Sequence, residues 1–419
     1  MNNGRTERPT RWAFILFLAT INLLAFMDRQ VFALMIPAIQ ADIALSDFHL
    51  GLIGGLAFAL VFSLFSFPLA WLADRFCRKG VIVGGLLFWS LMMAISGLAR
   101  GFATLFAARM GVGAGEAALT PAAHSLIRSV TKPNDLSRAM ALFGAGSALG
   151  LGLAYLLGGQ IYTLFAGIGD PDVLGLAPWQ WVFISFAFPG LVLGVWLSRL
   201  KSPAKSTDES TPSNQLPARH PIGNGPLILL FAGIGCFSTA IHAFNTWLPA
   251  HFVRAFNWSI GDVGTTFSII VAIGGLAGMF GSGWIGDRHL AKKGAPAILL
   301  IFMAIAALVA IPVLGLAALW PKAWMTVLVL FPAVTLTAAP AVLGPTFVQV
   351  IAPSDQRARY SALYLISYTL IGSAFGPALV GLVSDSGIGL ANAISLVAST
   401  GLIFATGLFW CASRKPISS

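Results

Sequence analysis

The chain consists largely of long apolar segments, and this pattern restricts its possible folds more than any other feature. A helix that crosses the hydrocarbon core of a membrane needs roughly 20 apolar residues, and each of these segments is about that long. Only 10% of the 419 residues are charged, against roughly 25% in a soluble protein, so most of the surface is expected to face lipid. We predict an all-α membrane protein with twelve transmembrane helices at residues 12–37, 49–72, 81–99, 102–127, 139–165, 178–198, 226–251, 263–285, 295–319, 324–350, 360–384 and 388–411.

A single long polar stretch separates the twelve segments into two sets of six. We therefore expect an N-terminal bundle at residues 1–198, a linker at 199–225 and a C-terminal bundle at 226–419. The two sets also repeat in sequence, and such repeats place a transport site near the membrane midplane between the halves. The matched pairs are Gly51 with Gly264, Trp71 with Trp284, Asp74 with Asp287 and Arg75 with Arg288.

Basic residues are distributed unevenly among the connections between segments. If the N-terminus is cytoplasmic, the outer connections hold only Arg100, Arg254 and Lys322. Cytoplasmic loops are enriched in Lys and Arg, so we expect a multi-pass protein of the cell membrane with both termini in the cytoplasm. The first segment is long and lacks a cleavage site, which predicts a retained helix rather than a signal peptide. This topology accounts for the net charge of +10, so nucleic-acid binding is not expected.

The sequence offers little for enzymatic or metal chemistry. The three cysteines form no CxxC pair, and no histidine spacing suits a metal. Neither a nucleophile–base pair nor a metal cluster is evident at a predicted membrane surface, so we expect a protein that is not an enzyme and needs no cofactor. A channel, the other non-transport alternative, would not require two matched repeats.

The connection after the second segment reads AWLADRFCRK at residues 70–79. It resembles the signature loop of the major facilitator superfamily, GxxxDRxGRR, with Ala70 and Cys77 in place of two glycines. The second copy, GWIGDR at 283–288, keeps the first glycine and lacks the later basic pair. The resemblance implies the twelve-helix transporter fold and a cytoplasmic gate that holds the halves together, although topology alone explains the basic residues equally well. The gate residues that it implies are Asp74, Arg75, Arg78, Arg138, Asp287 and Arg288.

Two further motifs narrow the resemblance. The first segment contains AFMDR at residues 25–29, and the fourth contains RMGVGAGEA at residues 109–117. Together they resemble the spinster branch of the superfamily, whose members are thought to carry lysophospholipids or sphingoid phosphates. This implies a monomeric, proton-driven transporter of an amphipathic anionic lipid that also contacts membrane lipids. The same features resemble proton-coupled organic-anion symporters, so the alternative substrate is a small organic or sugar acid.

Four ionisable residues lie inside predicted membrane helices, where each costs at least a few kcal/mol, so each is a functional hypothesis. We predict that Asp28 and Glu116 are protonation sites, because burial disfavours a charged carboxylate and a nearby arginine favours it. Arg29 and Arg109 stay charged and suit either those carboxylates or an anionic substrate. The rise of about 1.5 Å per residue predicts two levels across the membrane: Glu116 lies nearer the cytoplasmic side than the other three residues. The alternative is two static ion pairs that fix helix 1 to helix 4.

The second half offers polar side chains but few charges. His242 and Asn245 lie on one face of helix 7, at a depth similar to that of Asp28. A histidine there can join the proton path or bind a headgroup, or simply hydrogen-bond between helices. Tyr364 and Tyr368 of helix 11 either line the pathway or pack, and we include Tyr368 among the candidate substrate-binding residues.

Overall fold

The computed structural model describes residues 11–75, 77–132, 135–168, 175–200, 225–293, 296–352 and 357–415. Within these residues the fold is all-helical, as predicted. Water is absent from the hydrocarbon region, so a spanning segment must satisfy its own backbone hydrogen bonds, and a helix does this. The first half contains α1 Trp12–Asp42, α2 Asp47–Gly51, the π-helical turn η1 Leu52–Leu56, α3 Ala57–Arg75, α4 Arg78–Ser96, α5 Phe102–Glu116, α6 Leu119–Val130, α7 Leu136–Ala166 and α8 Pro178–Arg199.

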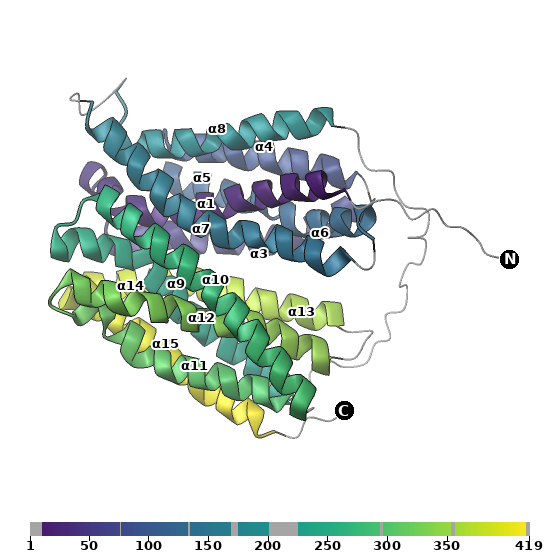
Figure 1. Ribbon diagram of the computed structural model, residues 1–419. Coiled ribbons are helices and arrows are strands. Elements are labelled where there is room, and N and C mark those ends of the chain that lie inside the picture. Colours follow the sequence, from purple (N-terminus) through teal and green to yellow (C-terminus); the bar gives the residue numbers. More distant parts are fainter. Residues whose placement is uncertain are drawn as a thin grey trace.

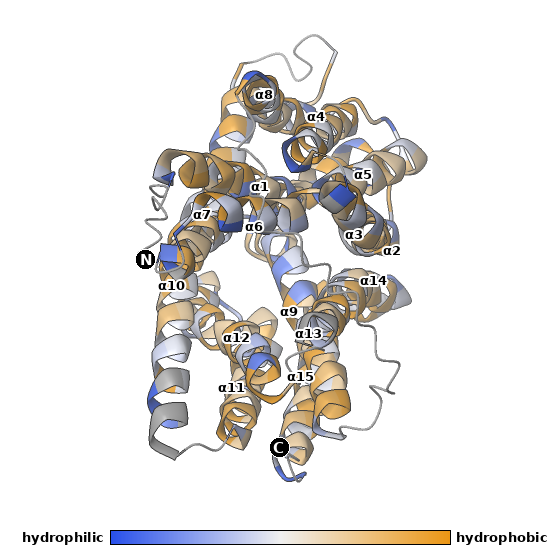
Figure 2. Cartoon of the chain, turned by 90° about the vertical axis from the view of Figure 1, so that its right-hand side faces the viewer, coloured by the Kyte–Doolittle hydropathy of each residue, from blue (hydrophilic) through white to orange (hydrophobic). Residues whose placement is uncertain are grey.

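Residues 201–224, within the predicted linker, lie outside the described residues, and the second half begins after them. Its helices are α9 Gly225–Phe256, α10 Ile260–Lys293, α11 Ala297–Gly315, the short η4 Ala317–Leu319, α12 Ala323–Ile351, α13 Arg357–Ile366, the π-helical turn η5 Ser367–Ser373, α14 Ala374–Val383, the π-helical turn η6 Ser384–Ile388 and α15 Leu390–Ser413. In Figure 1, α1 to α8 occupy one side of the molecule and α9 to α15 the other. Figure 2, turned by 90°, shows the same division into two groups of helices.

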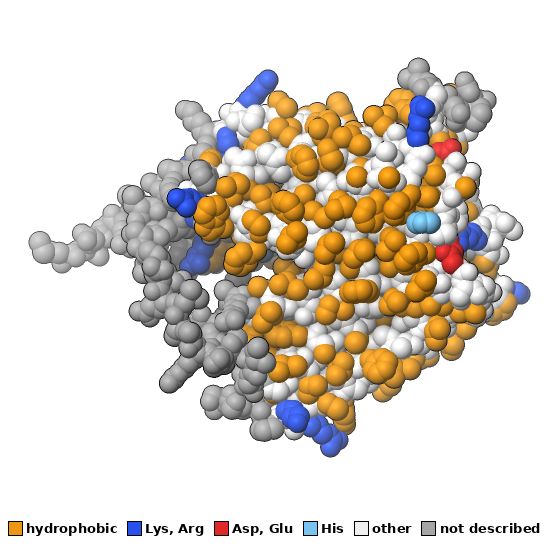
Figure 3. Space-filling view, turned by 180° about the vertical axis from the view of Figure 1, so that it is seen from behind, with side chains coloured by type: hydrophobic (Ala, Val, Ile, Leu, Met, Phe, Trp, Pro, Cys, Tyr) orange, Lys and Arg blue, Asp and Glu red, His pale blue; other side chains and the backbone are white. Residues whose placement is uncertain are grey.

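Eleven helical stretches of the described residues are long and apolar enough to cross a membrane. The remaining predicted span, residues 102–127, is the fourth along the chain. It is interrupted after Glu116 and therefore appears as two shorter helices, α5 and α6. The prediction of twelve transmembrane helices is confirmed in this form. Figure 3 shows apolar side chains across the middle of one face of the molecule, with charged side chains near its two ends. That distribution is the one a membrane-spanning bundle requires.

The two ends of the molecule differ in how the halves meet. We call the end where α1 begins and α15 finishes the terminal end, and the opposite end the distal end (Figure 1). Contacts between the halves run through α1 with α9, α7 with α10, and α14 with α2 and η1. By contrast, α6 and α13, the terminal-end parts of helices 4 and 11, pack mainly within their own halves. The halves are therefore joined most closely toward the distal end.

Candidate functional site

A break in helix 4 positions Glu116. Helix α5 ends at this residue and α6 begins at Leu119. Pro121 has no N–H with which to bond the main-chain oxygen of Ala117, and its ring crowds that carbonyl, so the helix is interrupted there. The Glu116 carboxylate, 1% exposed, thus lies at a discontinuity of the helix rather than within a regular turn.

Glu116 forms an ion pair with Arg29 of α1. The Arg29 Nε donates to Glu116 Oε2 at 2.6 Å, and the Glu116 side chain is fully buried while that of Arg29 is 27% exposed. Sequence spacing predicts that Glu116 lies on a deeper level than Arg29. The structure shows that the long arginine side chain spans the two levels and joins them.

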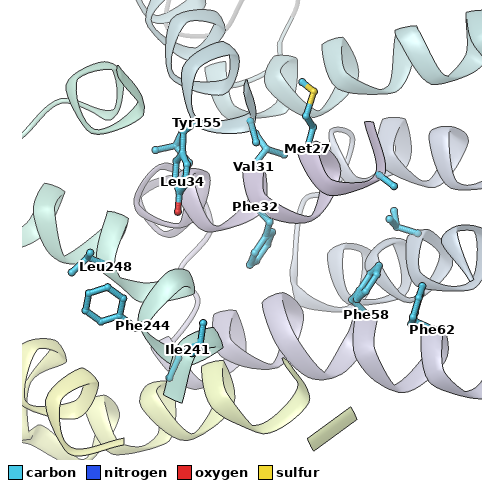
Figure 4. Packing of buried hydrophobic residues seen from close by; sticks show 14 of the residues in the cluster. Met27, Val31, Phe32, Leu34, Phe58, Phe62, Tyr155, Ile241, Phe244 and Leu248 are labelled. Atoms are coloured by element: carbon cyan, nitrogen blue, oxygen red, sulfur yellow. The ribbon is translucent and has the colours of Figure 1, made fainter. Parts of the chain in front are cut away.

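Phenylalanine rings surround the Arg29 guanidinium. Its central carbon lies 4.9 Å from the Phe26 ring, 4.6 Å from Phe58 and 4.8 Å from Phe62. Figure 4 shows Phe58 and Phe62 side by side on α3, and their rings stack at 5.3 Å. A guanidinium attracted to aromatic faces keeps its charge in a place where water is scarce. The site therefore combines one partly exposed cation with an apolar wall.

Arg109 and Asp28 form a second contact between α5 and α1. An Arg109 terminal nitrogen donates to the main-chain oxygen of Asp28 at 3.0 Å, and the guanidinium lies 5.3 Å from the Phe32 ring. Both side chains are almost fully buried, at 1% for Arg109 and 2% for Asp28. Arg109 thus binds the backbone of α1, and this hydrogen bond does not use the Asp28 carboxylate.

Several polar atoms of this charge cluster lack hydrogen-bond partners. Among the described residues, Asp28 Oδ1, Glu116 Oε1 and Arg109 Nε are all buried and unbonded. A buried polar group without a partner costs about 1–3 kcal/mol, and more if it is charged. Such a group can gain a partner when a carboxyl is protonated or the cluster rearranges. The hydrogen-bonding capacity of the cluster is therefore not fully used among the described residues.

The second half supplies polar side chains opposite Arg29. His242 of α9 is half-buried, with Nδ1 2.9 Å from the Ser238 main-chain oxygen and its ring edge-on to Tyr368 at 5.5 Å. Helix α9, which carries His242, packs against α1, which carries Arg29. Asn245 is exposed one turn further along α9. The predicted residues His242 and Tyr368 are thus brought together.

Tyr364 differs from Tyr368. It is buried, and its hydroxyl donates to the Pro340 main-chain oxygen at 2.8 Å, so it packs α13 against α12. Near Asn245, the Gln30 amide donates to the Tyr155 hydroxyl at 2.6 Å, and that hydroxyl lies 3.5 Å from the Asn245 main-chain oxygen. This bridge from α1 through α7 to α9 was not predicted, because glutamine and tyrosine carry no charge to draw attention.

A second ionic contact joins the halves at the distal end. Asp47, at the start of α2, receives two hydrogen bonds from Arg254 of α9, at 2.8 and 2.9 Å. The Ser384 hydroxyl also donates to Asp47, at 2.7 Å. Asp385 accepts from the main-chain N–H groups of Asp47 and Phe48 at 3.1 and 2.9 Å. This set was not predicted from the sequence, although Arg254 was one of the few basic residues expected on the outer side.

The predicted cytoplasmic gate is described only in part. The side chains of Asp74 and Asp287 lie outside the described residues. Arg75 and Arg288 are exposed, and each stacks on the tryptophan four residues before it, at 5.2 Å on Trp71 and 5.1 Å on Trp284. The two repeats therefore share this cation–aromatic contact. Arg138 is exposed and Arg78 is half-buried.

Comparison with known proteins places the chain among membrane transporters. Residues 18–377 match the family model described as Major Facilitator Superfamily. An MFS-type efflux pump of Mycolicibacterium smegmatis is 28% identical over 96% of this chain and 93% of the pump. Human protein spinster homolog 1 is 27% identical, covering 90% of this chain and 74% of its own length. The hexuronate transporter of Bacillus subtilis is 23% identical, covering 67% of this chain and 66% of its own.

A solved structure shows the same fold. It is that of a bacterial homolog to the human lysosomal transporter spinster, in an inward-facing and unoccupied conformation. The two structures superpose with a TM-score of 0.82 over 97% of this chain and 98% of the other, at 23% sequence identity.

Proposed function

This chain belongs to the Major Facilitator Superfamily and is a spinster-like secondary transporter, and on that premise we propose that it carries an amphipathic anionic lipid in exchange for proton movement. The proposed substrates are lysophospholipids and sphingoid phosphates. The two halves, residues 1–198 and 226–419, alternately open the site to each side of the membrane. The termini lie in the cytoplasm of a cell-membrane protein, and the chain acts as a monomer.

The observation that carries the proposal is the environment of Arg29. The Arg29 side chain is 27% exposed, and three phenylalanine rings lie within 5 Å of its guanidinium. A phosphate or carboxylate suits the guanidinium fork. An acyl chain suits the apolar rings of Phe26, Phe58 and Phe62 beside it. One site can thus bind both ends of an amphipathic anion.

Competition for Arg29 provides the coupling. In this conformation Arg29 holds the Glu116 carboxylate at 2.6 Å. An anionic substrate that takes the guanidinium leaves Glu116 buried without its cation, which is unfavourable for a charged carboxylate. Protonation of Glu116 removes that penalty. Asp28, buried beside Arg109, is the second carboxyl group that takes up and releases a proton.

The distal contacts support a defined state of the transport cycle. The Asp47–Arg254 pair and the contacts of Asp385 close the distal end, whereas α6 and α13 pack mainly within their own halves. With the termini in the cytoplasm, this is an inward-facing arrangement. The cytoplasmic gate of Asp74, Arg75, Arg78, Arg138, Asp287 and Arg288 then forms when the transporter faces outward.

A small organic or sugar acid remains the second candidate substrate. The hexuronate transporter among the relatives favours it, as do the polar groups of Gln30, Tyr155 and Asn245. Most of these polar groups, however, bind one another: Gln30 donates to Tyr155, and His242 contacts Ser238. Few remain to bind the several hydroxyl groups of a sugar acid, so the lipid is the better match.

A transport screen in proteoliposomes tests the proposal. The purified protein is reconstituted and offered labelled lysophospholipids and hexuronates, each with and without a pH gradient of either sign. We expect gradient-dependent movement of the lysophospholipid and little movement of the hexuronate. Movement of hexuronate alone would overturn the lipid assignment, and transport indifferent to the gradient would overturn the coupling.

A further inference from the structure

A groove between α3 and α4 lies apart from the charge cluster, and the end of α5 forms its floor. Figure 2 shows these three helices along one side of the first half. Helix α5 packs on both α3 and α4, which meet each other much less, so a space remains between them. The groove has a volume of about 640 Å³, within the range of small-molecule sites. None of the described residues that line it is charged, and they include Phe65, Leu69, Val81, Phe88, Ala114 and Gly115.

Two neighbouring glycines of α4 shape this groove in opposite ways. A Cβ added to Gly85 would lie 2.6 Å from the main-chain oxygen of Gly115, so α4 and α5 are packed closely at this point. A Cβ added to Gly84 would meet nothing within 4 Å, and Gly84 is exposed and lines the groove. The missing side chain of Gly84 thus leaves the space open, while the floor behind it is tightly packed.

The groove extends through about one leaflet of a membrane. Cys77 lines its terminal end and Phe88 its inner end, and a rise of about 1.5 Å per residue places them roughly 16 Å apart along α4. Half of a hydrocarbon core of roughly 30 Å is about 15 Å. Phe65 on α3 and Phe88 on α4 are both exposed, so the groove opens to the surroundings of the protein. An acyl chain of the adjacent leaflet therefore matches this space in length and polarity.

The terminal end of the groove is basic and aromatic. Arg75 follows the lining residue Leu72 by three positions on α3, so the two share a helix face. Arg75 is exposed, and its guanidinium stacks on Trp71 at 5.2 Å. Tryptophan is enriched at the level of the lipid headgroups, and the planar fork of arginine suits a phosphate. An anionic headgroup is therefore favoured at the end where the chain would enter.

We propose that this groove binds an anionic membrane phospholipid, with one acyl chain between Phe65 and Phe88 and the phosphate at Arg75. The site differs from the transport site at Arg29, and it does not depend on which substrate is carried. Lipid tails are as apolar as the groove, so close packing around the chain and the charge at its mouth provide the preference for this lipid.

Photocrosslinking tests the proposal without a transport assay. Wild type in phosphatidylcholine nanodiscs receives a trace of phosphatidylglycerol with a diazirine in one acyl chain, and mass spectrometry maps the labelled peptides. We expect stronger labelling of α3 and α4 than of α11, whose exposed Ile305 and Leu308 report ordinary lipid contact. Labelling no stronger than that of α11 would overturn the proposal.

The headgroup is tested with a phosphatidylcholine carrying the same diazirine chain. This lipid should label α3 and α4 about fivefold less than phosphatidylglycerol, since one basic residue contributes about that factor toward anionic lipid. In Arg75→Gln the two lipids should label equally. Equal labelling by both lipids in wild type would overturn the assignment of an anionic lipid.

Gly84→Leu tests the position of the chain, because its side chain enters the groove and its Cβ meets no neighbour within 4 Å. The variant should lower the labelling of α3 and α4 to the level of α11. Gly407→Leu on α15 is the matched control, since Gly407 is also exposed and a Cβ there also meets nothing within 4 Å. It should keep the wild-type pattern. Full labelling of α3 and α4 in Gly84→Leu would show that the chain does not lie in the groove.

The reaction of Cys77 with a maleimide gives a second test in wild type, which applies even if Gly84→Leu does not fold. Cys77 is exposed and lines the groove, whereas Cys411 is exposed near the end of α15. In detergent-purified protein, added phosphatidylglycerol should slow the reaction at Cys77 and leave that at Cys411 unchanged. A Cys77 rate that is the same with and without the lipid would contradict the proposal.

Discussion

At the scale of single residues, Arg29 is the side chain on which the account depends most. It pairs with Glu116 of α5 and lies among three phenylalanine rings. Arg109, its neighbour in the cluster, is 1% exposed and bonds to the backbone of Asp28. Accessibility therefore separates the roles of the two arginines. Arg29 can meet a substrate, whereas Arg109 stabilises the structure around Asp28.

Arg29→Lys tests this assignment. Lysine keeps the charge but loses the planar fork that binds phosphate through two hydrogen bonds and stacks on aromatic rings. We expect the KM for an anionic lipid to rise on the order of tenfold, since a hydrogen bond to a charged group has about that effect. Initial rates of uptake over a range of substrate concentrations measure the change.

The matched control for this experiment is Arg414→Lys. Arg414 also stacks on an aromatic ring, with Trp410 at 4.8 Å, but it lies at the end of α15. Its variant should keep the wild-type KM. Equal KM values for wild type and Arg29→Lys would show that Arg29 does not bind the transported anion.

At the scale of elements, η1 in the second predicted span approaches η5 and α14 in the eleventh closely, and this contact closes the distal end. Gly55, in the π-helical turn η1, packs directly on η5 and α14. A Cβ added there would lie 2.5 Å from the Ser373 main-chain oxygen and 3.0 Å from that of Ala374. Irregular turns of the π type occur often at functional sites, and here η1 and η5 both lie at this contact.

Gly55→Leu should hold the distal end open. The added side chain cannot fit against the backbone of η5, so the two elements must separate and the closed state loses stability. Electron-spin distance measurements between labels at His49 and Ser386, both exposed at the distal end, should show a longer mean distance than in the wild type. Gly275→Leu on α10, where a Cβ meets nothing within 4 Å, is the control that should keep the wild-type distance. An unaltered distance in Gly55→Leu would show that this contact does not limit closure.

The sequence predicts much of the fold and the membership of the charge cluster, for physical reasons. Long apolar segments have few alternatives to membrane helices, and Asp28, Arg29, Arg109 and Glu116 stand out because charges are rare in such segments. The Arg29–Glu116 pairing depends on how α1 and α5 are rotated about their own axes. The spacing of residues in the sequence gives their depth along each helix and does not give this rotation.

At the scale of the whole molecule, the halves are joined more closely at the distal end than at the terminal end, and in the proposed cycle this is one of two states. The Asp47–Arg254 pair joins the halves, and its side chains are only 8% and 29% exposed. The removal of one partner from such a pair leaves the other charge poorly solvated. The pair therefore stabilises the closed distal end as a unit with Ser384 and Asp385.

Asp47→Asn should shift the population toward a distally open state. The amide cannot pair ionically with Arg254, so the closed state loses stability relative to the open one. The labels at His49 and Ser386 should report a larger fraction of long distances. Asp262→Asn, which alters a carboxylate bound to Ser259 at the start of α10, should leave the distribution unchanged. Identical distributions for Asp47→Asn and wild type would show that the pair does not stabilise closure.

The central claim is that buried carboxylates next to Arg29 and Arg109 couple substrate movement to protons. The most direct measurement is concentrative transport of a lysophospholipid driven by a pH gradient in wild type, Glu116→Gln and Asp28→Asn. We predict that wild type accumulates the lipid against its gradient, and that each variant loses this accumulation or its pH dependence while exchange without a gradient persists in Glu116→Gln. Accumulation with unchanged pH dependence in both variants would contradict the claim and reduce the cluster to ion pairs that hold helix 1 against helix 4.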